Sequence, residues 1–216
     1  MNSLRLDTVN SILCIGAHAD DIEIGCGGTI LSLLKKRNDL DIRWVVLSGN
    51  QIRAAEARSS AECFLAGART HQVEIASFQD ACFPYSDAMA TKKYFGELSQ
   101  SYSPDLIFTH RRDDAHQDHR FVADLTWQHF RENLILEYEI PKYEGDLDQP
   151  SVFVPLGKEA AEAKIEMIVS EFQSQHDKQW FDPDAFRSLH RIRGIECQSQ
   201  SGFAEAFHCR KLLLGV

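Results

Sequence analysis

Short apolar runs alternate with helix-like segments along the first 130 residues of the chain. The apolar runs at 11–18, 41–48, 72–78 and 104–110 have the length and composition of buried strands. A helical pattern follows each of them, at 27–37, 53–68, 87–101 and 118–131. Strands and helices that alternate at this spacing are typical of βαβ units. We therefore predict an α/β fold with a mostly parallel sheet and helices on both faces.

The pattern changes after residue 134. Strand-like runs between 134 and 156 are interrupted by Pro141, Gly145 and Pro150, which favours a hairpin or an excursion over the end of the sheet. Amphipathic segments at 158–175 and near 184–194 predict two further helices. No repeat, low-complexity tract or linker divides the chain, so we expect residues 1–216 to form a single domain.

The composition is that of a soluble globular protein, and it narrows the choice of partners. Of the 216 residues, 44% are hydrophobic and 25% are charged, and no apolar run approaches the roughly 20 residues that span a bilayer. The net charge of -9 argues against a nucleic acid or an anionic membrane as partner. The six cysteines are irregularly spaced and the N-terminus lacks the apolar core of a secretory signal, so we expect free thiols and a cytoplasmic protein. The sequence does not determine whether the protein is a monomer or a homo-oligomer.

Two clusters of histidines and carboxylates each follow a predicted strand. The first is HADD, with His18, Asp20 and Asp21, and the second is DDAHQDH, with Asp113, Asp114, His116, Asp118 and His119. Sites in open parallel sheets lie in the loops outside the carboxyl ends of the strands. We therefore expect the two clusters to meet at one edge of the sheet.

The first cluster has the pattern of a hydrolytic metal site. A catalytic zinc ion takes three nitrogen or oxygen ligands from the protein and leaves a fourth position for water. His18 and Asp21 are three residues apart, so one tight turn can aim both inward. Asp20 must then point elsewhere, where its carboxylate can take a proton from the bound water. One aspartate as ligand and its neighbour as base explain why two carboxylates stand side by side.

The second cluster supplies the ligand that the first one lacks. His116 and His119 are also three apart, and they share a face if a helix begins there. One of them can bind the metal. The other, held charged by Asp118 or Asp114, can donate to a developing oxyanion.

Other interpretations of these clusters stay open on the residues alone. HADD before a helix is also a capping turn, and RRDDAHQDH is also a solvated charged loop. Two histidines and one carboxylate also describe a non-haem Fe(II) enzyme, although a free neighbouring aspartate is more useful to hydrolysis than to oxygen chemistry. A non-catalytic metal-binding or carbohydrate-binding protein is a further alternative, and the presence of Asp20 argues against it.

The same residues resemble a family signature. AHADDIEIGCGGTI resembles the AHPDD…G.GGT motif of the PIG-L/LmbE family of zinc-dependent N-acetyl-sugar deacetylases, and HQDH resembles its HPDH motif. The helix RAAEARSSAECFLAGA and the C-terminal GFAEAF are also similar to family elements. Ala19 and Gln117 stand where the family usually has proline. We therefore expect the two turns to be less stiff, and we expect all metal ligands to be retained. We expect Gly25, Gly27 and Gly28 to let the backbone pass close to the metal loop.

The resemblance implies a Rossmann-like fold and a zinc cofactor, with Fe²⁺ or another divalent ion as a substitute. It implies that His18, Asp21 and His119 are the metal ligands and that Asp20 is the general base. The implied substrate is a small molecule, a 2-acetamido sugar or a sugar conjugate, from which the acetyl group is removed.

The resemblance also implies the steps of the reaction. Zinc would polarise the acetyl carbonyl and lower the pKa of its bound water toward roughly 7. Asp20 would take the water proton, and His116 would stabilise the oxyanion or protonate the leaving amine, with Asp118 orienting it.

Residues in loops over the site are candidates for binding the sugar: Arg53, Arg111, Arg112, Tyr138, Lys142 and Tyr143. The arginines would suit a phosphate or carboxylate on the substrate. The structural alternative is a surface position for Arg53, a local ion pair for Arg111 and Arg112, and core or lid packing for the two tyrosines. We expect the remaining histidines to be structural, with His110, which ends a strand beside the site, as the exception to watch.

Overall fold

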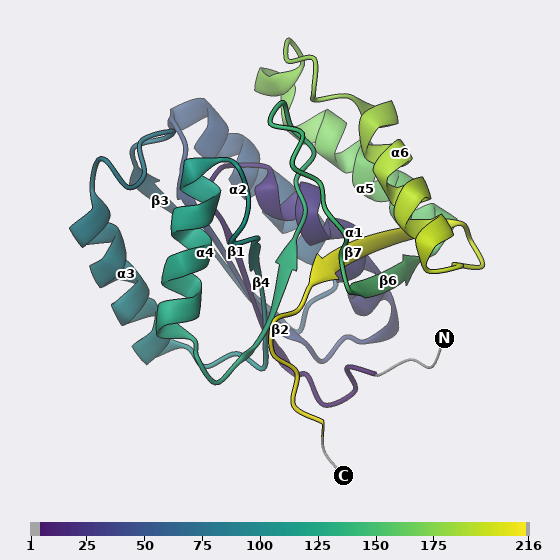
Figure 1. Ribbon diagram of the computed structural model, residues 1–216, viewed down its shortest axis with the longest axis horizontal. Helices are drawn as coiled ribbons and strands as arrows, with labels where there is room; N and C mark the ends of the chain where they lie inside the picture. Colours follow the sequence, from purple (N-terminus) through teal and green to yellow (C-terminus); the bar gives the residue numbers. More distant parts are fainter. Residues whose placement is uncertain (1–4, 215–216) are drawn as a thin grey trace.

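A seven-stranded sheet forms the centre of the computed structural model, which describes residues 5–214 (Figure 1). Its strand order is β3-β2-β1-β4-β5-β7-β6. Five strands are parallel: β1 (Ser11–Gly16), β2 (Asp41–Ser48), β3 (Thr70–Phe78), β4 (Leu106–His110) and β5 (Leu134–Tyr138). β7 (Phe203–His208) is antiparallel to β5 and also to β6 (Val152–Leu156). The predicted α/β class with a mostly parallel sheet is confirmed, and the order 3-2-1-4-5 is that of a Rossmann-like sheet.

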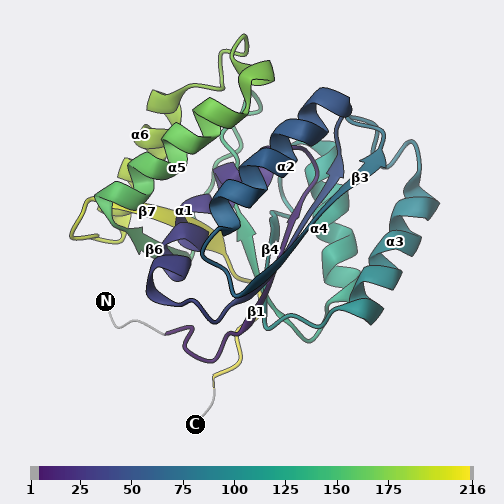
Figure 2. The same cartoon turned by 180° about the vertical axis from the view of Figure 1, so that it is seen from behind.

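Helices cover both faces of the sheet. α3 (Ala88–Ser101) and α4 (Gln117–His129) lie on one face, and α1 (Asp21–Lys36), α2 (Gln51–Leu65) and α5 (Lys158–Glu171) lie on the other (Figures 1 and 2). A 3₁₀ turn, η1 (Gln173–Gln175), leads to α6 (Pro183–Glu196), which packs beside α5 and β7. Apolar side chains fill the space between the sheet and the helices on both faces. Successive residues of β1 point to opposite faces, so Ile12 and Cys14 belong to one core cluster and Leu13 and Ile15 to the other.

The first helix begins at Asp21, six residues earlier than predicted. The three glycines therefore lie inside α1 rather than before it. A Cβ on Gly25 would lie 2.4 Å from the ring of Tyr138, and one on Gly27 would lie 2.6 Å from the ring of Phe64. The glycines let α1 approach β5 and α2 closely, and their predicted role beside the metal loop is wrong.

The segment after β5 crosses the end of the sheet and forms no hairpin. β5 and β6 are not paired, since β7 lies between them. Residues 139–151 make the predicted excursion, and several of them line the cavity described below. The other predicted helices and strands are present, and their ends differ from the predicted ones by at most four residues.

The C-terminal AEAF element ties three parts of the fold together. The carboxylate of Glu205 in β7 accepts hydrogen bonds from the backbone N–H groups of Gly28 and Thr29, at 2.8 and 2.7 Å. Lys164 of α5 is fully buried and donates to Glu205 and to the carbonyl of Ile24, both at 2.7 Å. Removing either charge would leave its partner buried and unpaired, so this contact fixes α1 against α5 and β7.

All six cysteines are free. Within residues 5–214, no helix combines the length and the apolar character that crossing a bilayer requires.

Candidate metal centre

The two polar clusters meet at the carboxyl ends of β1 and β4, at the upper edge of the sheet in Figure 1. β1 ends at Gly16, so that His18 lies in the turn that leads into α1. β4 ends at His110, and His116 caps the start of α4. Because β1 and β4 are paired and parallel, their following loops lie side by side, as the sequence predicts.

Three side chains offer donor atoms at the spacing of a tetrahedral metal site. His18 Nδ1 lies 3.2 Å from His119 Nε2. The two oxygens of Asp21 lie 3.3 Å from His18 Nδ1 and 3.5 Å from His119 Nε2. Donors bound tetrahedrally to one zinc ion at 2.0–2.2 Å are separated by about 3.3 Å. The ligand set expected from the sequence therefore fits a zinc-sized ion.

The outer partners of both imidazoles strengthen this fit. His18 Nε2 lies 3.0 Å from Asp118, and His119 Nδ1 lies 3.0 Å from Asp114. A carboxylate on the far nitrogen holds the ring proton there and leaves the near nitrogen as a lone pair, as in carboxylate–histidine–zinc triads. Two lone pairs 3.2 Å apart repel each other unless a positive charge lies between them.

The pKa values of His18 and His119 also indicate that the two rings together hold one positive charge. Burial lowers the pKa of His18, but the carboxylates of Asp21 and Asp118 outweigh it and raise the pKa to about 10. Burial and the neighbouring His110 lower the pKa of His119 to about 3. A single proton on His18 thus takes the position of a cation, and a metal ion that binds there must displace it.

Neighbouring groups of donor atoms overlap with this set. His116 lies close enough to join His18 and His119, and His110 lies close enough to join Asp21 and His119. His110 is fully buried, its Nε2 is 3.1 Å from Asp21, and its ring stacks on His119 at 3.9 Å. His110 Nε2 also accepts a hydrogen bond from the backbone N–H of Ala17 at 2.9 Å. His110 therefore packs against the expected ligands, and its place at a strand end was the sequence signal for it.

Asp20 is held in an unusual conformation with one oxygen left over. Its backbone φ of 143° is rare for a residue with a side chain, and the side chain caps no helix N–H group. Oδ1 accepts a hydrogen bond from Arg53 at 3.0 Å. Oδ2 is buried and has no hydrogen-bond partner within residues 5–214. Burial raises the pKa of Asp20 to about 7, against the lowering effect of Arg53. The capping interpretation is therefore wrong for Asp20, because its side chain accepts no hydrogen bond from the first turn of α1.

The structure corrects the predicted partners of His116. Its Nδ1 accepts a hydrogen bond from the backbone N–H of Asp118 at 3.2 Å. The Asp118 carboxylate instead bonds to His18 and to the backbone N–H of Phe83, and Asp114 bonds to His119. Burial and the nearby His18 lower the pKa of His116. His116 is thus a neutral imidazole with its proton on Nε2, because neither carboxylate is available to hold it charged.

The family signature extends over most of the site. The profile of the PIG-L family, described as GlcNAc-PI de-N-acetylase, matches residues 13–130, more than half of the chain. The chain belongs to the PIG-L family. Every residue of the metal centre lies within the matched range.

Solved structures show the same fold at low sequence identity. N,N'-diacetylchitobiose deacetylase from Pyrococcus horikoshii, complexed with the inhibitor MPG, superposes with a TM-score of 0.71 and 19% identity, over 94% of this chain and 84% of that one. The hydratase GalB from Pseudomonas putida KT2440 gives 0.75 and 16%, over 96% and 100%. The zinc-inhibited form of teicoplanin deacetylase Orf2 gives 0.70 and 12%, over 93% and 97%.

Asp118 should act in this PIG-L protein by positioning the ligand His18. Replacing it by asparagine leaves the size of the side chain unchanged but weakens the hold on the His18 ring. We expect the affinity for zinc to fall about 10- to 100-fold, the usual effect of losing an outer partner of a metal-binding histidine. Titration against a chromophoric chelator measures it. Unchanged affinity with a lower rate would instead mean that Asp118 acts on His116.

A cavity of about 500 Å³ opens over the metal centre of the PIG-L protein. Three of the predicted substrate-binding residues line it: Arg53, Lys142 and Tyr143. The ammonium group of Lys142 is already paired with two carboxylates, Asp114 at 3.1 Å and Asp146 at 2.6 Å, so it is less available to a substrate than the sequence suggests. Tyr143 is 68% exposed at the rim. Sequence reasoning missed the rest of the wall: Asn50, Asp80, Ala81, Ile140, Glu144, Gln175, Lys178 and Trp180.

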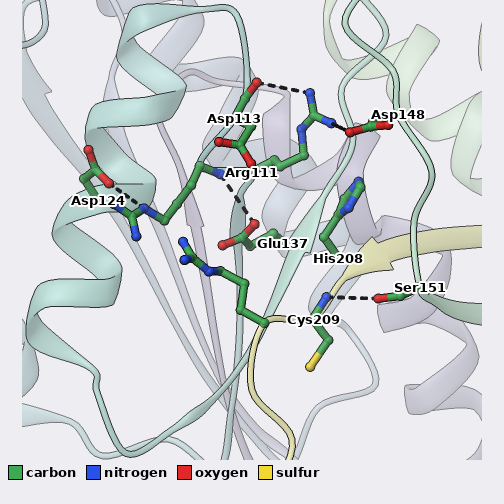
Figure 3. A pocket seen from close by; sticks show the side chains of 10 residues that line it. Arg111, Asp113, Asp124, Glu137, Asp148, Ser151, His208 and Cys209 are labelled. Carbon is green, nitrogen blue, oxygen red and sulfur yellow. Dashed lines mark hydrogen bonds and ion pairs between the residues drawn. The ribbon is translucent and has the colours of Figure 1, made fainter.

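Three predicted substrate-binding residues do not line this cavity. Arg111 and Arg112 line a second cavity of about 500 Å³, where Arg111 lies against Asp148 (Figure 3) and Arg112 pairs with Asp124 at 2.6 Å. The local ion-pair alternative thus holds for both. Tyr138 is fully buried and donates its hydroxyl to the carbonyl of Ile15 at 2.7 Å, so it is a core residue.

Proposed function

We propose that this PIG-L protein is a metal-dependent N-deacetylase of a 2-acetamido sugar or sugar conjugate. One observation carries the proposal: Asp20, which has a carboxylate oxygen without a partner in the described residues, lines the same cavity as three donors whose spacing fits a zinc-sized ion. A site that only binds a ligand has no use for a buried base with a raised pKa. Family membership and the deacetylases among the similar folds support the same reaction class.

The proposed reaction depends on a bound metal ion. His18, Asp21 and His119 would hold it, and it would supply a Lewis acid for the acetyl carbonyl and for the attacking water. We propose Zn²⁺, with Fe²⁺ or another divalent ion as a substitute. The teicoplanin deacetylase of similar fold is a zinc-inhibited form, so the activity of this chain must be compared across metals and zinc concentrations.

The residues of the chain would divide the proton transfers between them. Asp20 Oδ2 takes a proton from the attacking water, while Arg53 keeps the carboxylate in place through Oδ1. His116 donates a hydrogen bond from Nε2 to the oxyanion, and the proton collected by Asp20 can then pass to the leaving nitrogen. Breaking the C–N bond releases acetate and a free amine.

A hydratase is the second candidate function. GalB, the 4-carboxy-2-hydroxymuconate hydratase, shares the fold over its whole length, so the fold alone does not decide between amide hydrolysis and addition of water to a double bond. A base beside a metal serves either reaction. The cavity walls carry two further carboxylates, Asp80 and Glu144, beside three cations, Arg53, Lys142 and Lys178, so their charge favours neither substrate. The match to the GlcNAc-PI de-N-acetylase family favours amide hydrolysis.

A metal-loaded screen for amine release tests the proposal. The purified chain, loaded in turn with Zn²⁺, Fe²⁺ and Co²⁺, is incubated with N-acetylglucosamine glycosides, N,N'-diacetylchitobiose and an acetylated sugar nucleotide. We expect equal amounts of acetate and free amine from at least one of them. Zinc binding without amine release from any probe would contradict the deacetylase assignment. Oxygen consumption by the Fe²⁺ form would point instead to the non-haem iron alternative, and retained ligand affinity without turnover to a binding protein.

A further inference from the structure

The segment that crosses the end of the sheet between β5 and β6 is anchored at residues 139 and 148. Arg193 of α6 donates to both carboxylate oxygens of Glu139, at 2.6 and 2.9 Å, and to the backbone carbonyl of Asp148 at 2.9 Å. Arg193 and Glu139 are both buried, so the loss of either charge would leave the other unpaired. This anchor lies at the base of the segment, whereas the residues that line the cavity lie between its two ends.

The tip of the segment lines the cavity from an exposed turn. Tyr143 and Glu144 are both exposed, and both belong to the cavity wall. The N–H of Gly145, which has a φ of 61°, closes this turn onto the carbonyl of Lys142 at 3.4 Å. Such a bond holds the turn to itself but not to the rest of the protein. The position of the turn over the cavity therefore depends on the two residues that flank it, Lys142 and Asp146.

Lys142 and Asp146 attach the turn to the loop that leads into α4. Asp146 Oδ1 accepts a hydrogen bond from Lys142 Nζ at 2.6 Å, and Asp146 Oδ2 accepts one from the backbone N–H of Ala115, also at 2.6 Å. Lys142 Nζ also lies 3.1 Å from Asp114 Oδ1. The other oxygen of Asp114 lies 3.0 Å from Nδ1 of His119, one of the expected ligands. The ammonium group thus joins the turn to the outer partner of the metal centre.

This contact, which we call the Lys142 bridge, consists of one cation between two carboxylates. The side chains of Lys142, Asp114 and Asp146 are 9%, 4% and 15% exposed. Two carboxylates so shielded from water repel each other when the cation between them is lost. Asp114 would keep its hydrogen bonds from His119 and from the backbone N–H of His116. Asp146 is the more exposed of the two, so it would move toward water and take the turn with it.

We propose that Lys142 is a positioning residue for the deacetylation, because its bridge holds the cavity wall formed by residues 142–146 against the metal-binding loop. Its ammonium group already has two carboxylate partners, so an anionic group of the substrate would have to displace one of them. A wall that is already in place does not have to be ordered by the substrate, which lowers KM. The effect on KM rests on the proposed deacetylase function, whereas the bridge itself can be tested without any activity.

Steady-state kinetics of amine release distinguish a bridging lysine from a substrate-binding one. The probes are methyl N-acetylglucosaminide, which is neutral, and N-acetylglucosamine 6-phosphate, which is anionic. For Lys142→Met and for Asp146→Ala, we expect KM to rise about 10-fold on both probes, as when the wall is in place for about a tenth of the time. The kcat of the zinc-loaded variants should change less than about 3-fold, since Asp114 still holds His119. Lys142→Arg keeps a cation that can pair with two carboxylates, so its KM should lie within about 3-fold of the wild type.

The Asp146→Ala variant has opposite effects under the two roles. If Lys142 binds an anionic group of the substrate directly, its release from Asp146 would lower KM for the phosphate, and Lys142→Met would raise KM for the phosphate alone. Either result would overturn the inference. In the double variant, KM should rise about 10-fold, because both substitutions break the same contact, and the roughly 100-fold rise of two independent losses would also contradict the bridge.

Proteolysis measures the bridge independently of activity. Chymotrypsin cleaves after tyrosines in segments that open locally, and Tyr143 is 68% exposed at the tip. We expect cleavage of the zinc-loaded protein after Tyr143, followed by mass spectrometry, to be about 10-fold faster in Lys142→Met and Asp146→Ala than in the wild type. Lys93→Met is the matched control, because Lys93 is exposed and pairs with Glu97 on the surface of α3, 3.5 Å away. Its rate should equal that of the wild type.

The two measurements separate the failure of the bridge from the failure of the proposed function. Equal cleavage of the wild type and both bridge variants would overturn the inference and leave the deacetylase function intact. If no probe releases an amine, the deacetylase function fails and the proposed effect on KM fails with it.

Discussion

Replacing Asp20 by asparagine should lower kcat by about 10²- to 10⁴-fold, the contribution expected of a positioned general base. Asparagine matches aspartate in size and can still accept a hydrogen bond from Arg53 through its amide oxygen. Its nitrogen would occupy the position of Oδ2, the oxygen that has no partner among residues 5–214, and an amide nitrogen cannot take a proton from water. The effect should therefore fall on the chemical step, with little change in KM.

The metal content decides how this result is interpreted. Asp20 is adjacent to the ligand Asp21, so the variant must be shown to bind zinc as tightly as the wild type does. Asp39→Asn is a suitable control, since Asp39 is exposed and pairs with Arg37 far from the site. An Asp20→Asn variant with normal zinc binding and more than about half of the wild-type kcat would contradict the role of Asp20 as the base.

Two simple regularities let the sequence predict that the two clusters of histidines and carboxylates meet. Paired parallel strands bring their carboxyl-end loops together, and a spacing of three residues aims two side chains at one point. His18 and Asp21 satisfy the second rule, and the pairing of β1 with β4 supplies the first. Neither rule depends on details of packing, and the donor atoms that the two rules bring together lie 3.2 to 3.5 Å apart.

The choice of partner for a side chain was not predictable in the same way. The Asp118 carboxylate lies 3.0 Å from His18 but is 100 residues away in sequence, whereas the family resemblance implies that it orients His116. The strand β5 likewise directs Tyr138 into the core, where it fills the space left by Gly25. These outcomes depend on which face of an element is buried, and that face is determined only when the sheet is assembled.

The C-terminal half contributed the least to the prediction and supplies much of the cavity wall. Gln175 and Trp180 lie in a connection between helices that has no motif, and they reach the site only because α5 packs against α1 and α2. The residues of the cavity wall are therefore harder to predict from sequence than those of the two motifs.

Substitution of His18 should abolish tight metal binding, whereas substitution of His116 should not. His18→Ala removes one of the three donors at tetrahedral spacing, so its effect on zinc affinity should exceed the roughly 10- to 100-fold expected for Asp118→Asn, which loses only an outer partner. His116→Ala removes the proposed hydrogen-bond donor to the oxyanion, and its zinc affinity should stay within a few-fold of the wild type while kcat falls about 10²- to 10³-fold.

Thermal or urea unfolding with and without zinc measures the difference independently of activity. A metal at 100 times its Kd stabilises the native state by about 2.7 kcal/mol, so the wild type and His116→Ala should both unfold later when zinc is present. His18→Ala should show almost no such shift at the same concentration. If His116→Ala also loses the shift, His116 is a ligand, and the set formed by His18, His116 and His119 describes the centre. If His18→Ala keeps the shift, the ion must be held by Asp21, His110 and His119, and the facing nitrogens of His18 and His119 would share a proton instead of a metal.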